Sequence, residues 1–378
     1  MHRTNKSMWK LTGGLVAILM SLTLLTGFAP PTTPPQATPE AQAFDAEAVL
    51  RGKEGNYGIL PAGLPTPARR FKIGLSMITM AQDYTIDVVN GAKAMAEQLG
   101  VDFEVFDAAV DANKELADVE TMVANKFDGI FVYATDPALG PVISKKMKDA
   151  AIIPLGADTP MTAEDSYYGV PSIHAGYISG QYMMEQMKAK GWDAKETVYI
   201  FADLSAYPAC TMRLEGYKKA LDEFYPEFPK DNIVWYDVPY SLEESLKSIQ
   251  DTITAHPATN YLYAVACGDQ MAAGGARAME AAGYTSDNAM ISGQGGGIGP
   301  RDELKKPGSL YVSYTGYLGI CAGRLAVNFM VRLLNGEKDL PQNVQQKVVL
   351  LIKDTVDQYY PGGVEQCTEE DMRGQLTE

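Results

Sequence analysis

Residues 71–107, FKIGLSMITMAQDYTIDVVNGAKAMAEQLGVDFEVFD, contain the pattern that decides the fold. The segment from Ile73 to Met80 is a short, continuous apolar run, which is typical of a strand buried on both faces of a sheet. Between residues 86 and 99 apolar side chains recur at helical spacing, and Gly100 then provides the usual helix end. Residues 101–106 alternate like a second strand. In such a β-α-β unit ligands meet the loop that follows the first strand, which here contains Gln82, Asp83 and Tyr84.

The same alternation of strand and helix continues along the chain, changes near residues 167–172 and then begins again. Before the change, the sequence predicts strands at 71–78, 101–106, 128–133 and 152–156 and helices at 85–99, 113–125 and 137–150. After it, the sequence predicts strands at 197–202, 233–238, 260–266, 289–293, 309–314 and 347–352 and helices at 174–190, 209–225, 242–255, 270–282 and 320–334. The repeated pattern predicts an α/β fold with two similar open domains, each with a parallel core sheet.

The first 43 residues differ in composition from the rest of the chain. A basic start containing Arg3, Lys6 and Lys10 precedes an apolar run from Leu11 to Ala29, and a segment rich in Pro, Thr and Ala follows. We interpret this region as a secretion signal and a spacer, with an Ala-x-Ala cleavage sequence at residues 41–43. An uncleaved membrane anchor is the alternative, since the apolar run is barely long enough to span a bilayer.

Composition excludes several classes of protein. A hydrophobic content of 46% is that of a globular protein, and 378 residues are enough for two domains. The formal net charge of −15 and the lack of a basic patch argue against a nucleic-acid partner. No CxxC pair is present among the four cysteines, Cys210, Cys267, Cys321 and Cys367, so a zinc ribbon is excluded. In an exported protein they form one or two disulfides or remain lone buried thiols, and the sequence alone does not pair them.

Motifs of common enzymes are missing. The glycine-rich segment 293–299 contains no GxGxxG, and it lies late in the chain, so we interpret it as a flexible loop at a strand end. There is no GxxxxGK[ST] phosphate loop and no GxSxG nucleophile elbow. After the signal only His174 and His256 could serve as histidine bases, and structural roles suit both better. The acidic segment 107–116 lacks the glycine of a calcium loop, since Leu116 stands in that position. We therefore expect neither a metal nor a cofactor.

Polar and aromatic side chains gather instead where predicted strands end. Strand ends on one side of two facing sheets converge on a cleft, where carboxylates and amides suit the hydroxyls of a sugar and tyrosine rings suit its apolar faces. Any one of these residues could equally be an ordinary loop or cap residue, so the inference depends on their shared placement. The candidate ligand-binding residues are Gln82, Asp83, Tyr84, Asp158, Tyr207, Arg213, Asp269, Gln294 and Tyr317.

From Phe71 to Asp354 the chain resembles the periplasmic sugar-binding proteins of ABC transporters, of the ribose-binding type. The resemblance rests on four segments, of which the last is the most specific: KIGLSM with NGAKAMAEQLG, KFDGIFVYATDP, IIPLGAD, and ACGDQMAAGGARAMEAAG. It implies two Rossmann-like, parallel-sheet lobes joined by a three-segment hinge that crosses near residues 169–172, 316–319 and 343–347. By position it implies ligand contacts from Gln82, Tyr84 and Asp158.

The sequence departs from the pattern of that family at four site positions. Thr159 stands where an arginine usually follows the aspartate, and Gly268 replaces an asparagine. Gly293-Gln294-Gly295 stands where the family has glycine, an aromatic residue and a late aspartate, so the carboxylate expected at Gly295 is missing, and Tyr317 falls near a late glutamine. The pocket is therefore expected to have fewer charged hydrogen-bonding groups and more tyrosine than is usual, which argues against a common pentose or hexose in its usual pose. The expected ligand is a sugar, a polyol or a nucleoside-like compound.

We accordingly expect an exported, monomeric solute-binding protein that delivers a small polar ligand to the permease of an ABC importer, in the periplasm or at the outer face of the membrane. Two alternatives remain: a sensor that presents its ligand to a membrane kinase or chemoreceptor, and an α/β enzyme. The expected domains are a signal and spacer at 1–43, an irregular lead-in at 44–70, a first lobe at 71–170 and 318–345, a second lobe at 171–317 and 346–360, and a C-terminal tail at 361–378 that is loosely held.

Overall fold

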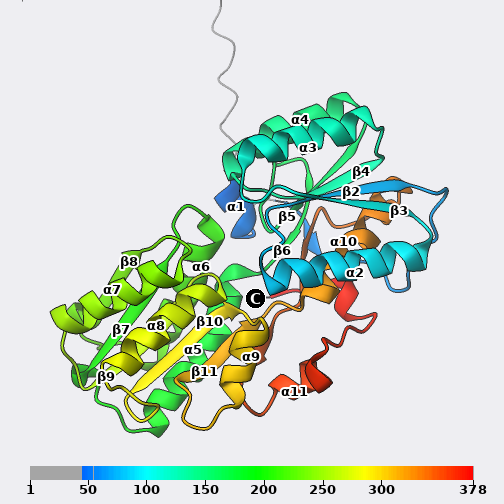
Figure 1. Cartoon of the computed structure of the whole chain (residues 1–378). Coiled ribbons are helices and arrows are strands. Elements are labelled where there is room, and N and C mark those ends of the chain that lie inside the picture. Colours follow the sequence, from blue (N-terminus) through cyan, green and yellow to red (C-terminus); the bar gives the residue numbers. More distant parts are fainter. Residues whose placement is uncertain (1–44, 54, 378) are drawn as a thin grey trace, which may run out of the picture. The chain divides into compact units, whose positions relative to one another are not determined.

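The computed structural model describes residues 45–53 and 55–377, so the predicted secretion signal lies outside the described residues. These residues form two halves, each built on its own sheet, which confirms the predicted α/β class (Figure 1). The sheet of the first half is parallel throughout, in the order β1-β12-β6-β5-β4-β2-β3. Its strands are β1 (Tyr57–Gly58), β2 (Lys72–Met77), β3 (Asp102–Asp107), β4 (Gly129–Tyr133), β5 (Ile153–Ala157), β6 (Ser166–Gly169) and β12 (Asn343–Gln345).

Helices cover both faces of this first sheet (Figure 1). Side chains of β4 alternate between the two faces: Phe131 joins the apolar cluster beneath α2 (Asp83–Leu99) and α10 (Gly319–Leu334), whereas Ile130 joins the cluster beneath α3 (Ala112–Ala124) and α4 (Gly140–Asp149). Burial on both faces explains the continuous apolar runs in the sequence. Gly100 ends α2 in the left-handed conformation with φ 70°, as its position predicts.

The second half repeats this arrangement. Its sheet has the order β13-β11-β10-β9-β7-β8, and only β13 runs antiparallel to its neighbour. The strands are β7 (Thr197–Asp203), β8 (Ile233–Asp237), β9 (Asn260–Val265), β10 (Ala289–Gly295), β11 (Tyr311–Gly316) and β13 (Val349–Leu351). The helices of this half are α5 (Ser172–Ala189), α6 (Pro208–Phe224), α7 (Leu242–Ala255), α8 (Asp269–Ala281), α9 (Ile298–Lys305) and α11 (Val356–Tyr359). Over the described residues of both halves, 3₁₀ turns lie at Pro137–Leu139, Ala194–Glu196, Lys230–Asn232, Pro361–Gly363 and Asp371–Arg373.

Close packing of α5 against α6 fixes the start of α6, which faces the other half. A Cβ added at Gly176 of α5 would overlap the backbone carbonyl of Arg213 on α6, and one added at Gly216 of α6 would overlap the carbonyl of Ile173. Only glycine permits an approach this close between two helix backbones. Arg213, a predicted site residue, is thus placed by glycines on both helices.

The chain passes between the two sheets at each of the crossings that the resemblance implies. It leaves the first sheet after β6 and enters α5 at residues 169–172, and it returns between β11 and α10 at residues 316–319. It leaves again between β12 and β13, near residues 345–349.

Some short elements differ from the sequence expectation. Within residues 44–70, predicted to be irregular, a helix α1 (Ala46–Leu50) and strand β1 form. Strands β6 and β12 were not predicted, because three or four residues with polar neighbours show no period. The predicted flexible loop at 293–299 instead leads into α9, because the N–H groups of Gly297 and Ile298 donate to Asp269 and Asp83.

The expectation of a loosely held C-terminal tail is wrong. Cys367 forms a disulfide with Cys321 of α10, and the backbone N–H of Cys321 donates to Glu365 at 2.9 Å. Met372 is buried in the apolar cluster of the first half. Covalent and apolar contacts of these kinds are invisible in the local sequence of the tail, which is polar.

Candidate functional site

A cavity of about 280 Å³ lies between the two halves, at the carboxyl ends of the parallel strands. From the first half it is lined by residues at or after the ends of β2, β3, β4 and β5, and from the second half by residues at or after the ends of β7, β8, β9, β10 and β11. Every residue predicted for the site lies on its wall: Gln82, Asp83, Tyr84, Asp158, Tyr207, Arg213, Asp269, Gln294 and Tyr317. The structure therefore brings the predicted set together; their contact with a ligand stays a prediction.

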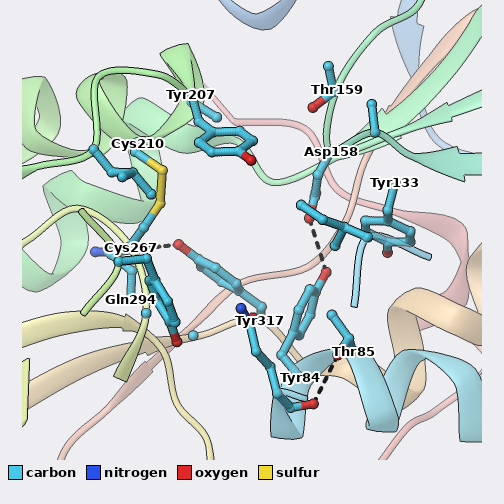
Figure 2. A pocket seen from close by; sticks show the side chains of 18 of the residues that line it. Tyr84, Thr85, Tyr133, Asp158, Thr159, Tyr207, Cys210, Cys267, Gln294 and Tyr317 are labelled. Carbon is cyan, nitrogen blue, oxygen red and sulfur yellow. Dashed lines mark hydrogen bonds between the residues drawn. A yellow bond between two sulfur atoms is a disulfide. The ribbon is translucent and has the colours of Figure 1, made fainter. Parts of the chain in front are cut away.

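Asp158 supplies a carboxylate from the first half. Its backbone is left-handed, with φ 54°, directly after β5, and this conformation directs the side chain into the cavity (Figure 2). Oδ1 accepts a hydrogen bond from the N–H of Val170 at 3.1 Å, and Oδ2 accepts one from the hydroxyl of Tyr84 at 3.4 Å. Burial raises the pKa of Asp158, and the positive charge of Arg213 opposes that shift. The carboxylate is held in place while Oδ2 keeps only a long hydrogen bond.

Two tyrosine rings form the floor of the cavity. The rings of Tyr84 and Tyr317 meet edge to face, with centroids 5.8 Å apart. Gln346 links them, because its Nε2 lies 3.3 Å from the Tyr84 hydroxyl and donates to the carbonyl of Tyr317 at 3.2 Å. Figure 2 shows both rings, together with Tyr207 and Asp158, pointing toward one another around the cavity. Such a pair offers the apolar face of one ring beside the edge of the other, and each ring also has a polar hydroxyl group.

Arg213 supplies the positive charge of the cavity wall. Its guanidinium lies over the ring of Tyr317, with Cζ 4.9 Å from the centroid. Only 7% of the residue is exposed, and its buried Nε has no hydrogen-bond partner in the protein. Nη1 approaches Cys267, whose disulfide with Cys210 forms the adjacent wall. A buried donor without a partner is costly, so the guanidinium depends on its remaining contacts with Tyr317 and Cys267.

Gln294 and Asp83 line the cavity but are already engaged by the protein. Gln294 Oε1 accepts the hydroxyl hydrogen of Tyr317 at 2.8 Å, and its Nε2 donates to Tyr217 at 3.0 Å. Asp83 is exposed, and its Oδ2 accepts the N–H of Ile298 at 2.9 Å across the two halves. Both residues therefore serve to position the wall, Gln294 by fixing the hydroxyl of Tyr317.

Tyr207 provides a second direct hydrogen bond between the halves. Its hydroxyl donates to the carbonyl of Thr135, which follows β4, at 3.0 Å. The ring forms part of the upper edge of the cavity in Figure 2. With the bond between Asp83 and Ile298, this contact shows that the halves touch each other on both sides of the cavity.

Asp269 holds the loop before α9 and has an unusual protonation equilibrium. Its Oδ2 accepts the N–H of Gly297 at 3.1 Å, and its Oδ1 is buried without a partner in the protein. Burial, together with the negative charge of Asp83, raises the pKa of Asp269 to about 6. Because this value lies above that of an unfolded aspartate, about 3.9, the folded protein binds the proton more tightly than the unfolded chain.

The stabilisation from this proton is complete below about pH 4 and is lost as the pH rises through about 6. Asp269→Asn, which keeps an acceptor for Gly297 without the charge, is expected to raise the free energy of unfolding at pH 7 by about 1 kcal/mol. It should also flatten the fall in stability between about pH 4 and pH 6. Urea unfolding of both proteins across this range measures the effect, and parallel pH profiles would contradict it.

Sequence reasoning missed several residues of the wall. Tyr133, the last residue of β4, and Tyr240, after β8, follow the same strand-end rule and could have been found by applying it to every strand. Gln346, which is not part of the wall but links the two tyrosine rings, was not found because β12 was not predicted. Ala46 and Leu50 of α1 also line the cavity, and nothing in their sequence separates them from an ordinary lead-in.

The part of the chain that the structure describes was searched for metal-binding clusters and for helices that could span a membrane. No group of three or more His, Cys, Asp or Glu side chains there could hold a metal ion. Within residues 45–53 and 55–377, no helix has both the length and the apolar character needed to cross a bilayer. All four cysteines are paired, as Cys210–Cys267 and Cys321–Cys367, which resolves the alternatives left open by the sequence.

Comparison with known proteins agrees with this geometry. Over 216 residues the chain is 27% identical to the ribose import binding protein RbsB of Salmonella typhimurium, covering 56% of this chain and 68% of that protein. Over 232 residues it is 27% identical to the L-arabinose-binding periplasmic protein of Escherichia coli, covering 56% and 67%. A solute-binding protein of an ABC transporter from Actinobacillus succinogenes, solved with bound D-allose, shares the fold with a TM-score of 0.66 at 22% identity, covering 77% of this chain and 100% of that one.

The model of the periplasmic binding protein domain matches residues 73–338, which include the elements from β2, apart from its first residue, to α10, the first two crossings and almost all of the cavity wall. The chain belongs to the periplasmic binding protein family.

Proposed function

We propose that this protein is the exported solute-binding protein of an ABC importer and that it binds a sugar or a sugar-like polar ligand in the cavity between its halves. One observation supports this most strongly: within a fold of this family, a carboxylate from one half, a guanidinium from the other and a pair of tyrosine rings all face one cavity. The sugar-binding relatives support the choice of ligand class.

The groups on the wall suit the two kinds of surface that a sugar presents. Asp158 would accept hydrogen bonds from hydroxyl groups, and Arg213 would donate to hydroxyl or ring oxygens. The rings of Tyr84 and Tyr317 would pack against the apolar C–H face of the ligand. Tyr207 and Gln82 would complete the upper and lower edges of the site, while Asp83, Asp269 and Gln294 would hold the wall in shape.

In this proposal the two halves act as lobes that close over the ligand, with domain limits as predicted from the sequence. Hydrogen bonds from Tyr207 to Thr135 and from Ile298 to Asp83 join the halves. These contacts would form on closure and break on opening, since each joins residues of different halves. Closure would present one joined surface to a membrane permease, and the ligand would leave chemically unchanged. We propose that the protein acts as a monomer outside the cytoplasm.

A thermal-shift screen tests the ligand class. We expect at least one of D-ribose, L-arabinose, D-allose, myo-inositol and adenosine to raise the melting temperature of the purified protein by several degrees at millimolar concentration, because ligands that bind only the folded state stabilise it. Sodium chloride and sucrose at equal concentration serve as controls for general solute effects. No shift with any of the five compounds would contradict the proposed function.

A further inference from the structure

Helix α1 lies outside the segment that matches the family, yet it contacts the cavity. The family match begins at residue 73, whereas α1 spans Ala46–Leu50. Ala46 and Leu50 are both part of the cavity wall, and Leu50 is half-buried there. Figure 1 shows α1 between the two halves, beside α6 and away from the crossings. The cavity therefore has a wall that the two sheets do not supply.

Specific contacts hold α1 against the second half. Arg51, directly after α1, forms a bidentate ion pair with Glu215 of α6, with both N···O distances 2.7 Å. Arg51 also pairs with Glu47 within α1 itself. At the start of the helix, the side chain of Asp45 accepts the N–H of Ala48 at 3.1 Å. Two parallel hydrogen bonds fix a guanidinium in orientation as well as position, so this contact is directional.

The other end of the segment belongs to the first half. Tyr57 and Gly58 form β1, which pairs in parallel with β12 at the edge of the first sheet. The hydroxyl of Tyr57 donates back to the carbonyl of Val49, and Val49 is buried. Residues 45–53 and 55–58, which we call the strap, thus connect α6 of the second half with the first sheet and pass beside the cavity between them.

We propose that the strap is a third wall of the ligand site, in which Leu50 contacts the ligand and the pair of Arg51 with Glu215 determines how slowly the ligand leaves; this inference rests on the proposed function. Glu215 lies two residues after Arg213, the cavity arginine, on the same helix. Opening of the halves moves α6 relative to the first sheet, so the strap must release α6 or move with it. The ion pair between Arg51 and Glu215 adds resistance to that motion.

A purely structural role for α1 predicts different results. If α1 only covered apolar surface, truncation of Leu50 would lower stability and leave affinity unchanged. If Leu50 contacts the ligand, Leu50→Ala removes apolar contact area from the bound state and weakens binding by roughly 5- to 20-fold. Ile59→Ala is the matched control, because Ile59 lies just beyond the strap, is 40% exposed and is not part of the cavity wall.

Calorimetric titrations of the full chain with D-ribose, L-arabinose, D-allose and myo-inositol measure this effect. We expect weaker binding in Leu50→Ala and wild-type affinity in Ile59→Ala for each compound that the wild type binds. Equal affinity in Leu50→Ala and wild type would overturn the role of the strap while leaving the proposed function intact. No binding by the wild type would remove the proposed function and the inference with it.

The ion pair is tested by kinetics. Glu215→Gln removes the negative partner of Arg51 on α6, and Glu47→Gln removes only its negative partner within α1. Stopped-flow displacement of the same compounds should show dissociation about 3- to 10-fold faster in Glu215→Gln and nearly unchanged in Glu47→Gln, because a partly exposed bidentate pair contributes modestly. Circular dichroism checks that both variants fold. Equal dissociation rates in the two variants would overturn the proposed role of the ion pair between Arg51 and Glu215 in slowing ligand release.

Discussion

Replacing Asp158 with asparagine is expected to weaken binding by about 30-fold, equivalent to about 2 kcal/mol, for whichever compound of the thermal-shift screen the wild type binds most tightly. The carboxylate lies in the cavity with Oδ1 bonded to Val170 and Oδ2 directed at the Tyr84 hydroxyl. Asparagine keeps an acceptor for Val170, but it loses the negative charge that attracts Arg213 and that, in our proposal, accepts hydrogen bonds from ligand hydroxyl groups. A ligand hydroxyl buried against the amide then has a poorer partner, which costs more than an exposed contact would.

Asp107→Asn is the matched control for this variant. Asp107 is the last residue of β3 in the same sheet, but its carboxylate accepts the N–H of Ala109 and does not line the cavity. Isothermal titration calorimetry of both variants should show a large loss of affinity for Asp158→Asn and none for Asp107→Asn. Wild-type affinity in Asp158→Asn, with its melting curve intact, would place the ligand elsewhere.

Removal of either disulfide should destabilise the protein by about 2–4 kcal/mol, but only one removal should affect binding. The bridges join residues 46 and 57 positions apart, so both restrict the unfolded chain to a similar extent. For a chain of this size, about 3 kcal/mol corresponds to a fall of roughly 6 °C in melting temperature. The double variants Cys321→Ser with Cys367→Ser and Cys210→Ser with Cys267→Ser are therefore controls for each other.

Their positions predict the difference in binding. Cys210 and Cys267 line the cavity beside Arg213, whereas Cys321 and Cys367 fasten the C-terminal tail to α10. Loss of the first bridge should therefore weaken sugar binding in addition to stability, and loss of the second should leave affinity close to that of the wild type. Calorimetry at a temperature where both variants are folded separates the effects. Equal affinities in the two double variants would contradict the assignment of the first bridge to the site.

Much of the fold could be predicted because its strands are buried on both faces. Continuous apolar runs such as those of β4 and β9 are recognisable without any alignment, and helix ends such as Gly100 follow local chemistry. The site could be located by the rule that parallel strands end at one edge of a sheet. From that rule Tyr84 and Tyr317, which are far apart in the sequence, were predicted to lie near each other, and both line the cavity.

The features that could not be predicted depend on contacts between distant parts of the chain. The sequence shows that Gln294 and Asp83 follow strands, but not that Tyr317 and Ile298 occupy their hydrogen-bonding atoms. Nothing local in residues 46–50 indicates a place beside the cavity, because the ion pair that fixes it involves Glu215. The polar tail likewise looked loose because its disulfide partner and its apolar contacts lie in the first half of the fold.

Whether the cavity binds a sugar-like ligand without converting it is tested most directly by calorimetric titration of the wild-type protein with the five compounds of the thermal-shift screen, which form the ligand panel. The bound ligand is then recovered and analysed by mass spectrometry. We expect one ligand per chain, a dissociation constant in the micromolar range or below, and a recovered ligand of unchanged mass. Absence of binding heat with every panel compound, or conversion of the bound compound to a product, would contradict it.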